Sequence, residues 1–158
     1  MPTVFDDVSF GPINMSLSKD EVVMSVNSAL KEVDMLKAIK RPSYHLSFGE
    51  KKRISIATVL SMKPQILALD EPSSNLDPKH RRDLIYFLKH IKLTRIIATH
   101  DLDLVVETCS RVLLLNKGKI AADGDSVDVL TNKSLLEEHS LEIPCLLLNK
   151  YSSAEIIA

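Results

Sequence analysis

Apolar residues recur at helical spacing in four segments of the chain, the last of which is residues 102–109, with Asp101 as its predicted cap. Behind Ser18, the apolar positions within residues 22–33 fall on one face of a helix, and a Ser-x-x-Glu pattern marks its start. This spacing predicts an amphipathic helix that Pro42 stops. A second Ser-x-x-Glu pattern at residues 47–50 precedes a helix that is apolar around much of its circumference, which favours a buried position. Pro78 marks the start of a third, amphipathic helix.

Short apolar runs between the later helices predict strands. Residues 65–69 and 95–99 are mainly apolar or β-branched segments that lead into polar residues, and the first is typical of a strand covered on both faces. Residues 111–115 form a third strand that turns back as a hairpin at an Asn-Lys-Gly sequence. The alternation of strands and helices predicts an α/β fold with a mainly parallel sheet. Residues 1–17 are expected to form a loop.

Composition excludes several classes of protein. The chain has 158 residues, of which 45% are hydrophobic, as expected for one globular domain. Its 20 basic and 21 acidic residues nearly cancel, so the chain has no overall positive charge that would attract a nucleic acid. Apolar runs are far shorter than the ~20 residues of a membrane span, and early acids at Asp6 and Asp7 argue against a secretory signal, so a cytoplasmic location is expected. Cys109 and Cys145 form no CxxC pair, which argues against a disulfide framework or a thiolate zinc site.

The glycines bear on phosphate binding. A P-loop needs two glycines five residues apart, followed by Lys and Ser or Thr. The four glycines of this sequence, at positions 11, 49, 118 and 124, contain no such pair. The sequence therefore has no P-loop.

Polar residues follow two of the predicted strands. Asp70 and Glu71 end the first strand and His100 follows the second, so all three are expected at the carboxyl edge of the sheet, where α/β folds bind ligands. Asp70 suits Mg²⁺, and Glu71 suits the orientation of an attacking water if Pro72 turns it back toward the site. The alternative is structural: two acids that end a strand and a histidine that begins the next helix.

The turn at residues 47–50 offers a helix N-terminus to phosphate oxygens, and Gly49 allows close approach of the backbone. The alternative here is an ordinary capping box that Glu50 closes on its own helix.

Four segments together resemble the ATP-binding subunits of ABC transporters. Residues 46–50 (LSFGE) are similar to the signature motif LSGGQ, and residues 66–72 (ILALDEP) to Walker B with its following glutamate. Residues 74–77 (SNLD) resemble the D-loop, and residues 98–101 (ATHD) the segment of the switch histidine. Their order and spacing match the family. Residues 8–22 are further similar to the helical subdomain of cobalt, nickel and vitamin importers of the energy-coupling-factor type.

The sequence departs from the family at two kinds of position. Phe48 replaces a signature glycine and Glu50 replaces the glutamine, and both changes are expected to weaken contact with nucleotide. The sequence also begins just downstream of the family's Q-loop. The resemblance therefore implies an incomplete P-loop NTPase-like fold, a parallel sheet with a helical signature subdomain whose N-terminal lobe is missing. The Walker A strand of that lobe is expected between the strand ending at His100 and the strand at residues 111–115.

The resemblance implies a role for each site residue. Asp70 holds Mg²⁺, Glu71 polarises the attacking water and His100 contacts the γ-phosphate. The signature residues contact ATP bound by an opposing subunit, and the D-loop aspartate lines the interface with that subunit. These residues are Ser47, Phe48, Gly49 and Glu50 of the signature, and Asp77 of the D-loop.

Three parts and one main function are expected. Residues 1–62 form a mainly helical signature subdomain, residues 63–124 carry Walker B, the D-loop and the switch histidine, and residues 125–158 form a tail of short helical fragments. The expected protein is an ATPase subunit of an importer for a transition-metal cation or vitamin, inactive as the isolated chain. It pairs with a second ATP-binding subunit and with integral membrane subunits, on the inner face of the cell membrane. The alternatives are a non-catalytic adaptor that lends its signature helix to a full-length partner, and a remnant of an interrupted gene.

Overall fold

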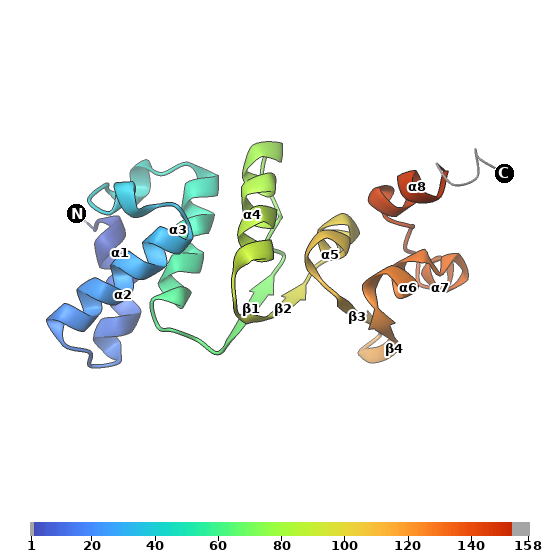
Figure 1. The fold of residues 1–158 in the computed structure, drawn as a ribbon, viewed down its shortest axis with the longest axis horizontal. Helices are drawn as coiled ribbons and strands as arrows, with labels where there is room; N and C mark the ends of the chain where they lie inside the picture. The colour runs from blue at the N-terminus through green and yellow to red at the C-terminus, as the bar shows by residue number, and fades with distance from the viewer. Residues whose placement is uncertain (1, 153–158) are drawn as a thin grey trace. The chain divides into compact units, whose positions relative to one another are not determined.

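The computed structural model describes residues 2–152, and the elements follow one another from the blue N-terminal helices to the red C-terminal ones in Figure 1. The chain divides into two compact units. The first consists of Met1–Leu69 and Ser74–Ile97, and the second of Asp70–Ser73 and Ala98–Ala158. Each unit is described by itself below.

Three helices make most of the first unit: α1 (Val4–Asn14), α2 (Lys19–Glu32) and α3 (Phe48–Leu60), which pack against one another. Two short 3₁₀ helices, η1 (Leu36–Ala38) and η2 (Ser43–His45), connect α2 to α3. The apolar faces of the three helices form the core of this unit, in which several side chains are almost fully buried: Val4, Val8, Val26, Leu30 and Ala57. The two helices predicted from Ser-x-x-Glu patterns are confirmed, because both patterns form complete capping boxes.

The loop predicted for residues 1–17 is wrong, because α1 occupies most of it. Thr3 caps this helix: its hydroxyl accepts the N–H of Asp6, and the Asp6 carboxylate accepts the N–H of Thr3. The pattern is a capping box with Asp in place of Glu. Pro12 lies inside the helix, to which it supplies no N–H.

Helix α2 ends ten residues before the predicted stop at Pro42, since Glu32 is its last residue. Asp34 has a left-handed backbone with φ of 53°, and the N–H of Met35 donates to the carbonyl of Leu30. This is a common way to end a helix, although the left-handed position is more often glycine.

The rest of the first unit contains strand β1 (Ile66–Asp70), helix α4 (Pro78–His90) and strand β2 (Thr94–Ala98), as predicted. The strands pair with each other, and the N–H of Glu71 donates to the carbonyl of Ala98, so their carboxyl ends meet. Burial of β1 on both faces is wrong: Leu67 is buried, but Ile66 is 56% exposed.

The second unit follows with helix α5 (Leu102–Thr108), the hairpin of β3 (Arg111–Asn116) and β4 (Lys119–Asp125), and helices α6 (Ser126–Thr131), α7 (Lys133–Glu138) and α8 (Cys145–Ser152). The predicted hairpin is confirmed, with Lys117 and Gly118 both at positive φ in its turn. The core of this unit is a cluster of four buried side chains from its helices: Val105, Leu130, Leu136 and Leu147.

The α/β class is confirmed, but the sheet is incomplete. The strands of the described residues form two separate pairs, β1 with β2 and β3 with β4. Each pair leaves outer edges without a neighbouring strand and apolar side chains open to solvent. On the hairpin, Leu113 and Leu115 lie on one face of β3, and Leu115 pairs across to Ile120.

We expect this apolar hairpin face to cause self-association of the 158-residue chain, because an open strand edge with exposed aliphatic side chains is a template for aggregation. Light scattering over a dilution series measures it. Replacing Leu113 and Leu115 together by Thr, which keeps strand propensity, should lower the association. The matched control replaces Val23 and Met24, which are exposed on α2, by Thr and should leave association unchanged. A monodisperse monomer at every concentration contradicts the prediction.

Candidate functional site

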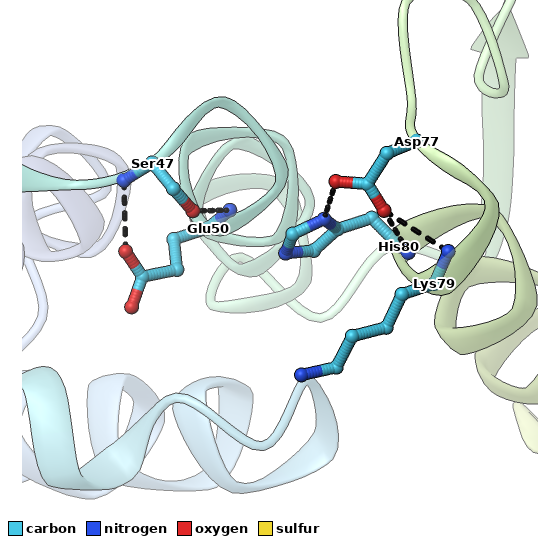
Figure 2. Close-up of polar contacts among 5 residues, drawn as sticks. All are labelled: Ser47, Glu50, Asp77, Lys79 and His80. Atoms are coloured by element: carbon cyan, nitrogen blue, oxygen red, sulfur yellow. Dashed lines mark hydrogen bonds and ion pairs between the residues drawn. The ribbon is translucent and has the colours of Figure 1, made fainter.

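The turn at residues 47–50, called the signature turn below, forms the N-terminus of α3, as Figure 2 shows. The Ser47 hydroxyl accepts the N–H of Glu50 at 3.3 Å, and the Glu50 carboxylate accepts the N–H of Ser47 at 2.8 Å. The other oxygen of Glu50 lies 2.8 Å from the Arg41 guanidinium. These contacts, first the Ser47 N–H and then Arg41, hold the pKa of Glu50 below its ordinary value. The capping box left open above as an alternative is therefore formed, and it keeps a negative charge at the turn.

The two central residues of the turn differ sharply in exposure. Phe48 is the first residue of α3, and 56% of it is exposed. Gly49 is buried beneath the ring of His80 from α4. A methyl group added to Gly49 would lie 2.7 Å from Nε2 of His80 and closer still to Cγ and Cδ2. The close approach that glycine allows here is thus made by the chain's own histidine.

Asp77 caps α4 through one carboxylate oxygen and contacts the His80 ring through the other (Figure 2). Oδ1 accepts the N–H groups of Lys79 and His80 at 3.0 and 2.9 Å, and Oδ2 lies 2.6 Å from Nδ1 of His80. The His80 N–H first, and the His80 ring next, lower the pKa of Asp77. The first unit thus brings the signature turn and the D-loop aspartate together through His80. Sequence analysis missed this residue; its signal is a histidine three positions after a helix cap.

The second unit joins Glu71 to the residues that follow β2. Strand β1 ends at Asp70, and Glu71 takes a left-handed backbone with φ of 42°, as a reversal at Pro72 requires. One Glu71 oxygen lies 2.7 Å from Nδ1 of His100 and also accepts the His100 N–H at 3.0 Å. The predicted meeting of Glu71 and His100 at the strand ends is present in the structure.

Thr99 is a further residue of this group that sequence analysis did not assign. Its hydroxyl donates to the second Glu71 oxygen at 3.0 Å and accepts the N–H of Asp101, whose own carboxylate caps α5. The ring of His100 first, and then the Thr99 hydroxyl and the His100 N–H, lower the pKa of Glu71. Glu71 is therefore a positioned, ionised carboxylate at neutral pH.

The fit to Mg²⁺ and ATP is partial. Asp70 is exposed at the end of β1 and offers one carboxylate. Within residues 2–152, no group of three or more His, Cys, Asp or Glu side chains is arranged to hold a metal. Asp70 can therefore hold Mg²⁺ only where phosphate and water oxygens complete the coordination shell. The sequence has no P-loop, so the described residues do not form a complete site of the kind that binds nucleotide phosphates.

Comparison with known proteins identifies the family. The family model described as "AAA domain, putative AbiEii toxin, Type IV TA system" matches residues 6–107. The structure of cbiO1 from Clostridium perfringens, described as part of the ABC transporter complex cbiONQ, superposes with a TM-score of 0.75 at 38% identity. That match covers 86% of this chain and 56% of cbiO1. The chain belongs to this AAA-domain family, and its fold is that of an ABC-type ATPase.

Curated relatives of this ABC-type ATPase chain support the assignment. A "Putative ABC transporter ATP-binding protein" of Geobacter sulfurreducens is 50% identical over 144 residues, which are 91% of this chain and 58% of that protein. The "Energy-coupling factor transporter ATP-binding protein EcfA" of Carboxydothermus hydrogenoformans is 46% identical over 147 residues, 91% of this chain and 54% of that protein. The chain thus spans somewhat more than half the length of these relatives. Over the part that the structure describes, no helix is both long and apolar enough to cross a bilayer.

We expect His100→Ala to raise the pKa of Glu71 toward its ordinary value, because the ring makes the largest contribution that lowers it. Carboxyl ¹³C NMR titration measures this pKa directly. Because the folded pKa is the lower one, the Glu71 contacts stabilise the fold above the pKa of unfolded glutamate, and this stabilisation is lost as pH falls through the folded value. His90→Ala is the control, because it removes a ring that is hydrogen-bonded to the Tyr86 carbonyl and that does not contribute to the pKa of Glu71. If the pKa of Glu71 is the same in His100→Ala as in the parent, the predicted effect of the His100 ring on Glu71 is contradicted.

Proposed function

We propose that this chain carries the signature and Walker B part of an ATP-binding subunit of an energy-coupling-factor type importer for a transition-metal cation or vitamin. The observation that carries the proposal is the group formed by Glu71, Thr99 and His100 at the carboxyl ends of β1 and β2. The order of motifs supports it, as do relatives whose names include an energy-coupling-factor ATP-binding protein and a component of a cbiONQ complex.

Glu71 is the proposed group that acts on water. Its two oxygens accept hydrogen bonds from His100 and Thr99, so the carboxylate is held in one orientation. A carboxylate that is ionised at neutral pH can accept a hydrogen bond from water and polarise it, whereas its lowered pKa makes it a weak base for complete proton removal. Orientation and polarisation of the attacking water are therefore the part we assign to Glu71, with contact to the γ-phosphate assigned to His100.

The remaining roles follow the same proposal. Asp70 would supply a carboxylate oxygen to Mg²⁺. This cation prefers oxygen ligands and is the usual metal in phosphoryl transfer. The turn of Ser47, Phe48, Gly49 and Glu50 faces ATP bound by an opposing subunit, and Asp77 lines the interface with that subunit. The negative charge that Glu50 holds makes this turn a weaker partner for phosphate than the glutamine of the family's signature.

A second candidate is a non-catalytic adaptor that offers its signature turn to a full-length subunit. The observation that favours it is a fully formed turn, with both hydrogen bonds of its capping box, in a sequence without a P-loop. Both candidates include a second ATP-binding subunit and integral membrane subunits as partners, with the chain peripheral on the inner face of the membrane. Both keep the division into residues 1–62, 63–124 and 125–158.

Affinity purification of the chain from solubilised membranes tests the shared part of these proposals. Copurification of the membrane subunits of one uptake system supports them and identifies the solute. Recovery of the chain from cytosol with no membrane subunit contradicts both.

We expect the 158-residue chain alone to show no tight binding of Mg-ATP. P-loop amides and lysine supply most of the phosphate affinity in this class of site, whereas Asp70 and Glu71 repel an uncompensated anion. Calorimetric titration measures the affinity. A dissociation constant in the micromolar range contradicts this expectation.

Glu71→Gln should change turnover only where a P-loop is supplied, for instance by joining the chain behind a lobe that carries a P-loop. There, loss of the carboxylate should lower kcat by about 10²- to 10⁴-fold. Glu142→Gln is the matched control, because Glu142 is an exposed glutamate of the same unit. Equal rates for the Glu71 variant and the parent remove Glu71 from the role proposed here.

A further inference from the structure

The imidazole of His80 is held between two motifs of the first unit. On one side its ring covers Gly49 at the start of α3, so closely that no Cβ fits there. On the other side its Nδ1 lies 2.6 Å from the carboxylate of Asp77 (Figure 2). The side chain of His80 is only 22% exposed, against 57% for that of Asp77. The ring is therefore a packed link between the two helix starts.

We propose that His80 is a positioning residue that fixes the signature turn to the D-loop aspartate, because its ring packs over Gly49 where no side chain would fit. The assignment of the two segments as signature and D-loop rests on the proposed function. The link itself rests on the contacts of Gly49, His80 and Asp77.

A change at Gly49 must therefore reach Asp77. The methyl group of an alanine would overlap Cγ of His80, and Cγ lies on the axis of the ring's own rotation. Turning the ring about χ2 cannot relieve this overlap, so χ1 or the backbone has to move. A change of χ1 at His80 carries Nδ1 away from the Asp77 carboxylate. Gly49→Ala thus breaks a contact made by a residue of a different helix.

The same geometry predicts how two substitutions combine. His80→Ala removes the ring, and with it both the overlap and the Nδ1 contact. In that background, Gly49→Ala meets an empty space and has nothing to displace. The effects of the two substitutions on Asp77 should therefore not add, as expected for residues that act through one contact.

Carboxyl ¹³C NMR titration of Asp77 in the 158-residue chain, without nucleotide, tests the link. Gly49→Ala and His80→Ala should each raise the pKa of Asp77 toward its ordinary value, and the double variant should raise it no further. Gly11→Ala is the matched control, because its methyl group would lie 2.6 Å from Cγ of the flexible Met62 side chain in the same unit. It should leave Asp77 unchanged. An Asp77 pKa that Gly49→Ala does not move, or that moves additively in the double variant, overturns the proposal.

Urea unfolding provides a second measurement in case Gly49→Ala folds poorly. Overpacking of this kind should raise the unfolding equilibrium constant by about 5- to 150-fold. The increase should largely disappear when His80→Ala is present. A Gly49→Ala chain that is unfolded, and that His80→Ala restores, supports the link. Failure of His80→Ala to restore it overturns the link.

A kinetic arm separates the link from the proposed function. The chain is paired with the full-length Carboxydothermus relative, so that the signature turn serves ATP bound by that subunit. His80→Ala should lower kcat several-fold with a smaller change in KM, because a misplaced turn weakens the transition state more than nucleotide binding. Equal kcat values for parent and variant overturn the positioning role. If the parent chain itself stimulates no turnover, the proposed function is contradicted, while the titration of Asp77 still decides the link.

Discussion

The hydrogen-bonding demand of helix N-termini organises both parts of the candidate site. The first N–H groups of a helix have no partner within the helix, so a side chain or a ligand must supply one. Ser47 and Glu50 do so for α3, Asp77 for α4 and Asp101 for α5. Each cap also fixes a segment that the family uses at nucleotide. The turns that begin at Ser47 and Asp77 are consequently held by their own side chains, and their carboxylates accept hydrogen bonds from backbone amides.

At the end of strand β1, both the backbone and the side chain of Glu71 make hydrogen bonds. Its N–H continues the β1–β2 ladder by donating to Ala98, while its left-handed backbone turns the side chain toward Thr99 and His100. A non-glycine residue in this conformation carries a conformational cost, which the surrounding contacts must offset. Three hydrogen bonds to its carboxylate provide that compensation. The conformation that exposes the carboxylate and the contacts that orient it thus depend on each other.

Local patterns could be predicted from the sequence, and long-range contacts could not. The capping boxes at Ser18 and Ser47 involve residues three positions apart, so they are legible in the sequence, and the hairpin turn at Gly118 is equally local. Helix α1 was missed; its capping box uses Asp where the boxes at Ser18 and Ser47 use Glu. The meeting of Glu71 with His100 followed from strand order, but the contact of Gly49 with His80 depends on how α3 packs against α4. Packing of that kind has no local signal.

Part of the candidate site lies at the ends of strands, which have less support from neighbouring elements than the helices have. Helices provide the buried cores of both units, whereas the strands form two pairs, and an isolated two-stranded sheet is only marginally stable in water. Glu71 and Thr99 are held at the ends of one such pair. Addition of a strand to that pair would bury its exposed apolar side chains, Ile66 and Ile96, and pair its open edge. Ordering of Glu71, the carboxylate proposed to act on water, is thereby coupled to completion of the sheet, so a P-loop lobe that brought such a strand would supply phosphate contacts and stabilise Glu71 in the same step.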